Sequence, residues 1–145
     1  MEFIDPVVIE SVLTNFRTWA IVGASSNPSR PSNDVMSFLH DLGYTVVPVN
    51  PYETSVLSKK CYPSLTAAST DWDIEVVDVF RRPSEVLEVA QEAISINAHA
   101  IWFQLGVTNF EAASLAVEAG LMVVMDTCPK IEIPRLDIAS KLWLL

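Results

Sequence analysis

Continuously apolar segments alternate with helical patterns along most of this chain. Between the apolar segments, apolar residues recur three and four positions apart, the spacing of one face of an α-helix. Segments that are apolar throughout, rather than at every second position, are typical of a parallel sheet covered on both faces. We therefore predict an α/β fold, a doubly wound sheet of five parallel strands with helices on both faces. The predicted strands are Thr18–Val22, Tyr44–Val49, Ile74–Phe80, Ala98–Phe103 and Leu121–Met125.

Residues that favour helix ends bound the predicted helices. Asp5 and Pro6 suit an N-cap and a first helical position, and Gly43 suits the end of a second helix that begins near Ser32. Thr108 begins a capping-box pattern with the glutamate three positions later. The residues predicted to form the apolar stripes of the helices are Ile9, Val12, Leu13, Phe16, Val35, Phe38, Leu39, Leu42, Val86, Val89, Ala90, Ala93, Phe110, Ala113, Ala116 and Val117.

Two segments give weaker patterns. Residues 51–70 predict only a polar turn and a short helix over Ser64–Ala68. The tail Leu136–Leu145 predicts a last helix with Leu136, Ala139 and Trp143 on one side. We favour packing of this tail on the core of its own domain, and the alternative is a contact in a homo-oligomer.

The composition narrows the class of partner. Half of the 145 residues are hydrophobic and 19% are charged, so we predict one folded domain over residues 1–145. The net charge of −9 argues against nucleic acid or an anionic membrane as the partner. No apolar run approaches the ~20 residues of a membrane span, and the acidic amino terminus lacks the basic flank of a signal peptide. The two cysteines are far apart in the sequence, which predicts no disulfide framework and favours a reducing cytoplasm.

The loop after the first predicted strand has the pattern of an anion site. In open parallel sheets, ligands bind beyond the carboxyl ends of the strands. Gly23 permits a sharp turn and a close approach of the backbone to a ligand. The N-terminus of the next helix favours an anion, and Arg30 adds guanidinium donors. The loop alone fits equally well an ordinary connection whose serines cap the helix.

Two common nucleotide-binding motifs do not match this sequence. A dinucleotide fingerprint would place glycines at the positions of Gly23, Ser25 and Pro28, and an acid at the end of the second strand. Only the first glycine is present and that strand ends in Val-Asn-Pro, which disfavours NAD. A Walker A loop needs glycine, lysine and a hydroxyl residue in succession, and none occurs, which disfavours ATP bound in that way.

Five sequence motifs resemble those of a known family, in the same order and spacing: IVGASSNPSRPS, GYTVVPVNPYE, DVFRRPSEV, AIWFQLGV and AGLMVVMDTCPKIE. They are similar to the small stand-alone CoA-binding proteins, which are related to the amino-terminal domain of the succinyl-CoA synthetase α subunit. The resemblance covers about Thr18 to Leu136. It implies a Rossmann-like fold with coenzyme A, or an acyl-CoA, lying across the carboxyl ends of the strands.

The resemblance also implies which residues contact each part of the ligand. The first loop would hold the phosphates, the end of the second strand would flank the adenosine, and the later strand ends would line the groove and meet the pantetheine arm. In that order, the implied residues are Gly23, Ala24, Ser25 and Arg30; Val49, Asn50 and Pro51; Phe80 and Arg81; and Gln104 and Gly106. Guanidinium groups for phosphate and an apolar shelf for adenine agree with general binding chemistry.

Four further positions bear on the groove and its chemistry. Ser58 stands where the family usually has a glycine, which questions the close approach of that loop. Ile133 stands where a histidine is common, which weakens the case for chemistry near the carboxyl end. Asp78 and Asp126 are interpreted as hydrogen-bond acceptors at strand ends rather than as paired acids.

The sequence favours a binding protein over an enzyme. The related synthetases use a phosphohistidine and an ATP-grasp region, whereas His40 and His99 lie away from the predicted strand ends. Cys128, close to Lys130, would allow a mixed disulfide or acyl exchange with CoA, but we favour an inert buried thiol. The alternative functions are an NAD-linked or acyl-transferring enzyme and an interaction protein without a ligand.

Overall fold

A five-stranded parallel sheet forms the centre of the molecule in a computed structural model, which describes residues 3–143. The strand order reverses between β1 and β5, because the chain continues from β1 to one edge of the sheet and later returns to the other side of β1. The predicted fold class, an α/β Rossmann-like doubly wound sheet, is confirmed. In spatial order the strands are β2 (Thr45–Val49), β1 (Thr18–Val22), β5 (Val76–Val79), β6 (Ala100–Phe103) and β7 (Met122–Met125).

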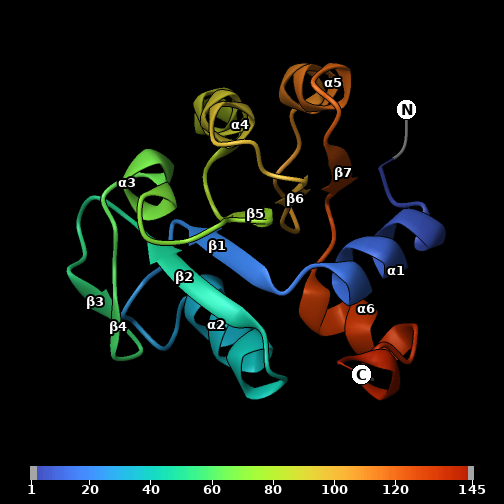
Figure 1. Cartoon of the computed structure of the whole chain (residues 1–145), viewed down its shortest axis with the longest axis horizontal. Helices are drawn as coiled ribbons and strands as arrows, with labels where there is room; N and C mark the ends of the chain where they lie inside the picture. The colour runs from blue at the N-terminus through green and yellow to red at the C-terminus, as the bar shows by residue number, and fades with distance from the viewer. Residues whose placement is uncertain (1–2, 144–145) are drawn as a thin grey trace.

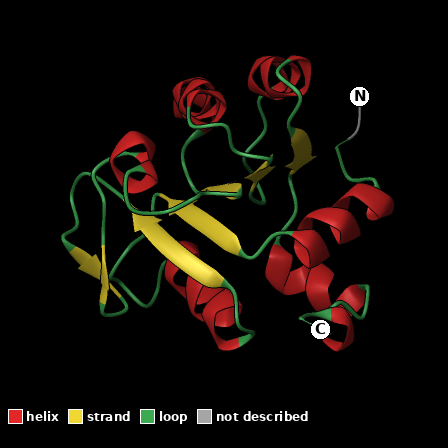
Figure 2. Cartoon of the chain, in the orientation of Figure 1, coloured by secondary structure: helices red, strands yellow, loops and turns green. Residues whose placement is uncertain are grey.

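Helices cover both faces of the sheet (Figures 1 and 2). One face carries α3 (Leu65–Ser69), α4 (Val86–Ser95) and α5 (Phe110–Glu118). The other carries α1 (Pro6–Asn15), α2 (Pro31–Asp41) and α6 (Pro129–Arg135). Each strand supplies both faces, because successive side chains point in opposite directions. Within β1, for example, Ala20 belongs to the core cluster under α4 and Ile21 to the cluster under α2, which explains why the strands are apolar throughout.

The predicted helix starts are largely confirmed. Asp5 Oδ1 accepts a hydrogen bond from the backbone N–H of Val7 at 2.9 Å and caps α1. Arg30 occupies the N-cap position of α2, with Pro31 as the first helical residue. The longest helix within residues 3–143 has 11 residues, and none of the helices there could cross a membrane.

The capping prediction for α5 is wrong by one residue. The N-cap is Asn109 rather than Thr108, and its side-chain oxygen accepts from the N–H of Ala112 at 3.0 Å. An asparagine caps a helix at least as well as a threonine, so the later residue prevails. Ala113 and Ala116 are buried as predicted, but Phe110 and Val117 are 53% and 49% exposed, because the buried face is centred on the alanines.

A small hairpin and the carboxyl-terminal segment differ most from the prediction. The weak segment 51–70 contains a two-stranded hairpin of β3 (Ser55–Val56) and β4 (Lys59–Lys60) before α3. A 3-10 turn over Pro83–Glu85 precedes α4. Among the described residues the last α-helix is α6, which ends before the predicted tail helix, and residues 136–143 form only a 3-10 turn over Ala139–Lys141. The last two residues of the predicted tail, Leu144 and Leu145, lie outside the described residues.

Candidate functional site

A cavity of about 930 Å³ opens beyond the carboxyl ends of β1, β5, β6 and β7. It spans the point where the strand order reverses, which is where ligands bind in open parallel sheets. Its volume lies within the range of small-molecule sites. Eight of the eleven residues implied by the resemblance line it: Gly23, Ser25, Arg30, Asn50, Phe80, Arg81, Gln104 and Gly106.

The other three of the eleven residues do not line this cavity. Ala24 is fully buried. Val49 and Pro51 line a second hollow of about 290 Å³ near the ends of β1 and β2. Arg81 lines both hollows, so a ligand that extended from one into the other would pass this side chain.

Gly23 is required by the close packing of two loops. Its φ is +90°, in the left-handed region, and a Cβ at this position would lie 2.2 Å from the carbonyl oxygen of Phe80. The N–H of Phe80 also donates to the carbonyl of Val22 at 2.8 Å. The glycine therefore makes the predicted sharp turn, and the backbone that it approaches closely is that of the loop after β5.

Two side-chain amides hold the loop that follows β1. Asn50 Nδ2 donates to the carbonyl of Ala24 at 2.8 Å, and Asn33 Nδ2 donates to the carbonyl of Ser25 at 2.9 Å. Within the described residues, the backbone N–H groups of Ala24 and Ser25 donate to no acceptor. Backbone donors beside a helix N-terminus are suited to a phosphate.

A carboxylate of the protein already accepts hydrogen bonds from the same loop. Glu53 Oε2 accepts from the N–H of Ser26 at 2.6 Å, and Oε1 accepts from the Ser26 hydroxyl at 3.1 Å. This contact shows that the loop can donate hydrogen bonds to an anionic group. Neither Glu53 nor Asn33 was predicted from the sequence as a site residue, although both are polar and lie close to predicted site residues.

Basic residues concentrate at the cavity in an otherwise acidic protein. Arg81 and Arg82 form ion pairs with Glu85, at 3.7 and 3.2 Å. Lys130 Nζ lies 2.7 Å from Asp34 Oδ2. The exposed Arg30 makes no ion pair within residues 3–143, so its donors are available to a ligand. The basic residues that line the cavity, four of the nine in the chain, are Arg30, Arg81, Arg82 and Lys130.

The loop after β6 presents an unsatisfied acceptor to the cavity. Gln104 is 5% exposed, lines the cavity, and its Oε1 has no hydrogen-bond partner among the described residues. Buried polar atoms are normally paired, so this oxygen is suited to a donor supplied by a ligand.

Gly106 donates its N–H to Asp126 Oδ1 at 2.8 Å, and open space surrounds the position where its Cβ would lie. The interpretation of Asp126 as a strand-end acceptor is confirmed.

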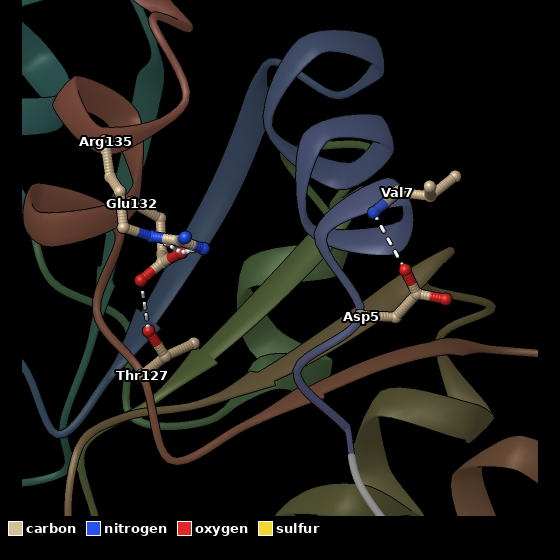
Figure 3. A network of polar contacts seen from close by, with 5 residues as sticks. All are labelled: Asp5, Val7, Thr127, Glu132 and Arg135. Carbon is tan, nitrogen blue, oxygen red and sulfur yellow. Dashed lines mark hydrogen bonds and ion pairs between the residues drawn. The ribbon is translucent and has the colours of Figure 1, made fainter.

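The start of α6 brings Cys128 to the cavity. Glu132, 6% exposed, accepts from the Thr127 hydroxyl at 2.9 Å and from Arg135 Nε at 2.9 Å, so its carboxylate lies between the two side chains (Figure 3). This network joins the end of β7 to the helix. Cys128 occupies the N-cap position between them, is 7% exposed and lines the cavity.

Several cavity residues were not identified from the sequence. Three of them lie in the first turns of α2, and the fourth comes from α6, a helix that was not predicted from the sequence. They are Ser32, Asp34, Val35 and Ile131. The proline that follows Cys128 was the available signal for α6, because proline is favoured at the first helical position.

The second carboxyl group considered in the sequence has no acceptor role. Asp78 is fully buried in β5, and neither of its side-chain oxygens has a hydrogen-bond partner among the described residues. The interpretation of Asp78 as a strand-end acceptor is therefore wrong. Burial raises the pKa of this carboxyl well above its ordinary value, which favours the neutral form.

Neither histidine lines the cavity. His40 lies on the exposed side of α2, and the His99 ring stacks on Phe16 with 5.1 Å between the ring centroids. Among the described residues, no group of three or more His, Cys, Asp or Glu side chains could hold a metal ion.

The fold places this chain among the Rossmann-like α/β domains, with a ligand-sized cavity at the point of strand reversal. Residues 17–134 match the family model described as a CoA binding domain. The match covers most of the chain, which therefore belongs to the CoA binding domain family. Membership supports binding of CoA, or a CoA-related small molecule, in general.

Two proteins of similar length match most of this chain, and a much longer synthetase matches it with about a quarter of its own chain. The uncharacterized protein YneT of Bacillus subtilis (strain 168) is 37% identical over 123 residues, which cover 85% of this chain and 90% of YneT. A hypothetical protein from Pyrococcus horikoshii OT3 is 41% identical, with a TM-score of 0.87 over 92% of each chain. The dinucleotide forming acetyl-coenzyme A synthetase 1 of Ca. Korarchaeum cryptofilum matches 79% of this chain with 26% of its own, at 22% identity and a TM-score of 0.66. The last likeness shows the fold alone.

Proposed function

We propose that this protein binds coenzyme A or an acyl-CoA in the 930 Å³ cavity, without turnover of its own. The observation that carries the proposal is the meeting, at one cavity, of the Gly23 loop, four basic residues and the unpaired oxygen of Gln104. CoA combines phosphates, an adenine ring and an arm with amide donors. Each of these groups finds suitable chemistry at the strand ends.

The order of the strands supports one orientation of the ligand. The adenosine would lie at the end of β2, near Val49, Asn50 and Pro51, and the phosphates would lie at the loop after β1. The arm would then pass Phe80 and Arg81 after β5 and reach the loop after β6. In this orientation the free N–H group of Ser25 and the guanidinium of Arg30 meet the phosphates, and Gln104 meets an amide of the arm.

Two features support binding without turnover. Neither histidine lines the cavity, so a phosphohistidine step has no group there. The histidine that is common near the carboxyl end of the family is replaced by Ile133, which is 1% exposed within the core. The residues at the cavity instead supply hydrogen-bond donors, acceptors and fixed charge, which are the groups of a binding site.

Arg30→Ala tests the binding site. We expect CoA to raise the melting temperature of the unaltered protein, and the variant to lose most of that rise. Removal of a charged hydrogen-bond partner costs roughly 1.5–3 kcal/mol, so calorimetry should show the Kd for CoA raised by about tenfold to a hundredfold. A flat response of the unaltered protein from micromolar to millimolar CoA would overturn the proposal.

Lys141→Ala is the matched control for this experiment. It removes the same charge but lies outside the cavity, where it loses only an exposed ion pair with Glu10. It should bind CoA as the unaltered protein does. Parallel titrations with NAD and NADP separate the proposal from an NAD-linked enzyme, which would respond to those cofactors and not to CoA.

A further inference from the structure

The proposed function leaves the thiol of Cys128 unused. The two free cysteines, Cys61 and Cys128, are both 7% exposed, but only Cys128 lines the 930 Å³ cavity. Cys61 lies outside it, and its Sγ donates to the carbonyl of Asn50 at 3.6 Å. The cavity is therefore the route by which a reagent reaches Cys128, and Cys61 serves as an internal reference of equal exposure.

Gln104 indicates which part of the ligand lies near this thiol. Its Oε1 is a buried acceptor without a partner, on the loop after β6, and β6 is the strand next to β7. An amide N–H of the pantetheine arm would satisfy this oxygen. The sulfur is at the end of that arm, beyond its amides, so it would extend past β6 toward the end of β7.

In the proposed orientation, the sheet order would bring the sulfur of CoA and the Cys128 sulfur to the same end of the cavity. Along the strand ends, β2, β1, β5, β6 and β7 succeed one another at intervals of about 4.8 Å, or roughly 19 Å in all. The proposed sequence of adenosine, phosphates and arm follows the same direction. Cys128 ends the short loop after β7 and is the N-cap of α6, so it lies where the far end of the arm would lie.

We propose that Cys128 is a site of reversible thiol–disulfide exchange with CoA bound in the cavity, an inference that rests on the proposed function. The Cys128 sulfur attacks one sulfur of a CoA disulfide, forming a mixed disulfide between Cys128 and CoA. The original S–S bond breaks, and the second CoA leaves as a thiolate that takes up the proton lost by Cys128. Cys128 is oxidised and the departing sulfur is reduced, so a disulfide of CoA is the only co-reactant.

Binding energy should direct this reaction to one cysteine. A disulfide held in the cavity reacts within a complex, so its effective concentration at Cys128 exceeds its concentration in solution. A disulfide that lacks the phosphates has no such advantage at a cysteine that is 7% exposed. Two disulfides with the same reacting arm should therefore differ in rate, and the one that carries the nucleotide should react faster with Cys128.

The experiment treats the full chain, free of reductant, with CoA disulfide and follows its intact mass. We expect addition of one CoA, located by peptide mapping at Cys128 and reversed by reductant. The disulfide of pantetheine, which has the same arm without the nucleotide, should react more slowly by a factor on the order of ten. Cys61→Ser should behave as the unaltered protein, and Cys128→Ser, in which serine suits the N-cap position, should gain no CoA.

Separate measurements distinguish failure of this inference from failure of the proposed function. Calorimetry with CoA in the presence of reductant measures binding alone, and Arg30→Ala should remove the rate advantage of CoA disulfide over the pantetheine disulfide. Binding without an adduct, an adduct at Cys61, or equal rates with both disulfides would overturn the exchange and leave binding intact. No binding under reductant would overturn both proposals.

Discussion

Asp78 is a buried carboxyl group inside an apolar sheet. It lies in β5 opposite Ile21 of β1 and Trp102 of β6, and all three side chains are fully buried. Its oxygens have no hydrogen-bond partner among the described residues, and burial raises its pKa well above 3.8. The folded protein therefore holds a proton at pH values where the unfolded chain has lost it.

Asp78→Asn should change how stability depends on pH. Because the folded pKa is raised, the stability associated with neutral Asp78 is fully present below about pH 3.8 and is lost as the pH rises toward the folded pKa. Asparagine cannot ionise, so the variant should gain about 1.4 kcal/mol relative to the unaltered protein for each pH unit within that window. Urea unfolding of both proteins at a series of pH values measures this difference, in which the other titrating groups cancel. A difference that stayed constant with pH would contradict the neutral state of Asp78.

At the scale of elements, the sequence predicted what depends on local patterns. The five strands and helices α1, α2, α4 and α5 follow from apolar runs, helical stripes and capping residues. Helix α6 was not predicted, because it has seven residues, contains Pro134, and begins at a cysteine rather than a usual capping residue. Its stability depends on tertiary contacts, such as those of the buried Ile133 and the ion pair of Lys130 with Asp34, which a local pattern does not reveal.

The sequence predicted which residues would be at the candidate site, but not how their side chains pack there. Residues at strand ends could be listed from the sequence, because parallel strands bring their carboxyl ends to one edge. At this edge of the sheet the structure has two separate hollows that share Arg81. This division could not be predicted, since it depends on side-chain packing. The same holds for the Glu53 contact with Ser26 and for the unpaired oxygen of Gln104.

The turn between β3 and β4 carries backbone strain that a glycine would relieve. Leu57 and Ser58 have φ values of +50° and +63°, the left-handed conformation that a two-residue hairpin turn of this kind requires. Ser58→Gly should therefore stabilise the protein by about 0.5–1 kcal/mol, because glycine adopts a positive φ without strain. Denaturant unfolding measures the gain. Ser55→Gly, in an extended and exposed position of β3, is the matched control and should destabilise; equal effects of the two changes would contradict the assignment of strain.

At the scale of the whole molecule, charge and shape act in opposite directions on an anionic ligand. The net charge of −9 repels such a ligand at long range, and solvent ions screen this repulsion beyond about a Debye length. Within the cavity, four basic side chains and the N-terminus of α2 act at short range. Local geometry therefore matters most for a small anionic ligand, which is why the net charge argues against nucleic acid as a partner without arguing against a small anion.

The carboxyl-terminal segment packs against the domain that carries it. Ile138 and Leu142 are 0% and 9% exposed in the core cluster under α1 and α2. Trp143 Nε1 donates to the carbonyl of Leu42 at 2.9 Å, and its ring lies edge-on to Tyr44 with 5.0 Å between centroids. These contacts favour the first of the two roles predicted for the tail, whereas its part in a homo-oligomer stays a hypothesis.

Removal of residues 138–145 separates the two roles. Loss of the buried Ile138 and Leu142 side chains should cost about 3–6 kcal/mol of unfolding free energy, since burial of each such side chain stabilises by roughly 1.5–3 kcal/mol. If the tail serves its own domain, this loss should be the same at every protein concentration, because no association is involved. Melting curves over a range of concentrations, together with sedimentation of both proteins, measure the effect. A truncated chain that kept its stability but dissociated from a larger assembly would contradict the intramolecular role and assign the tail to the subunit contact.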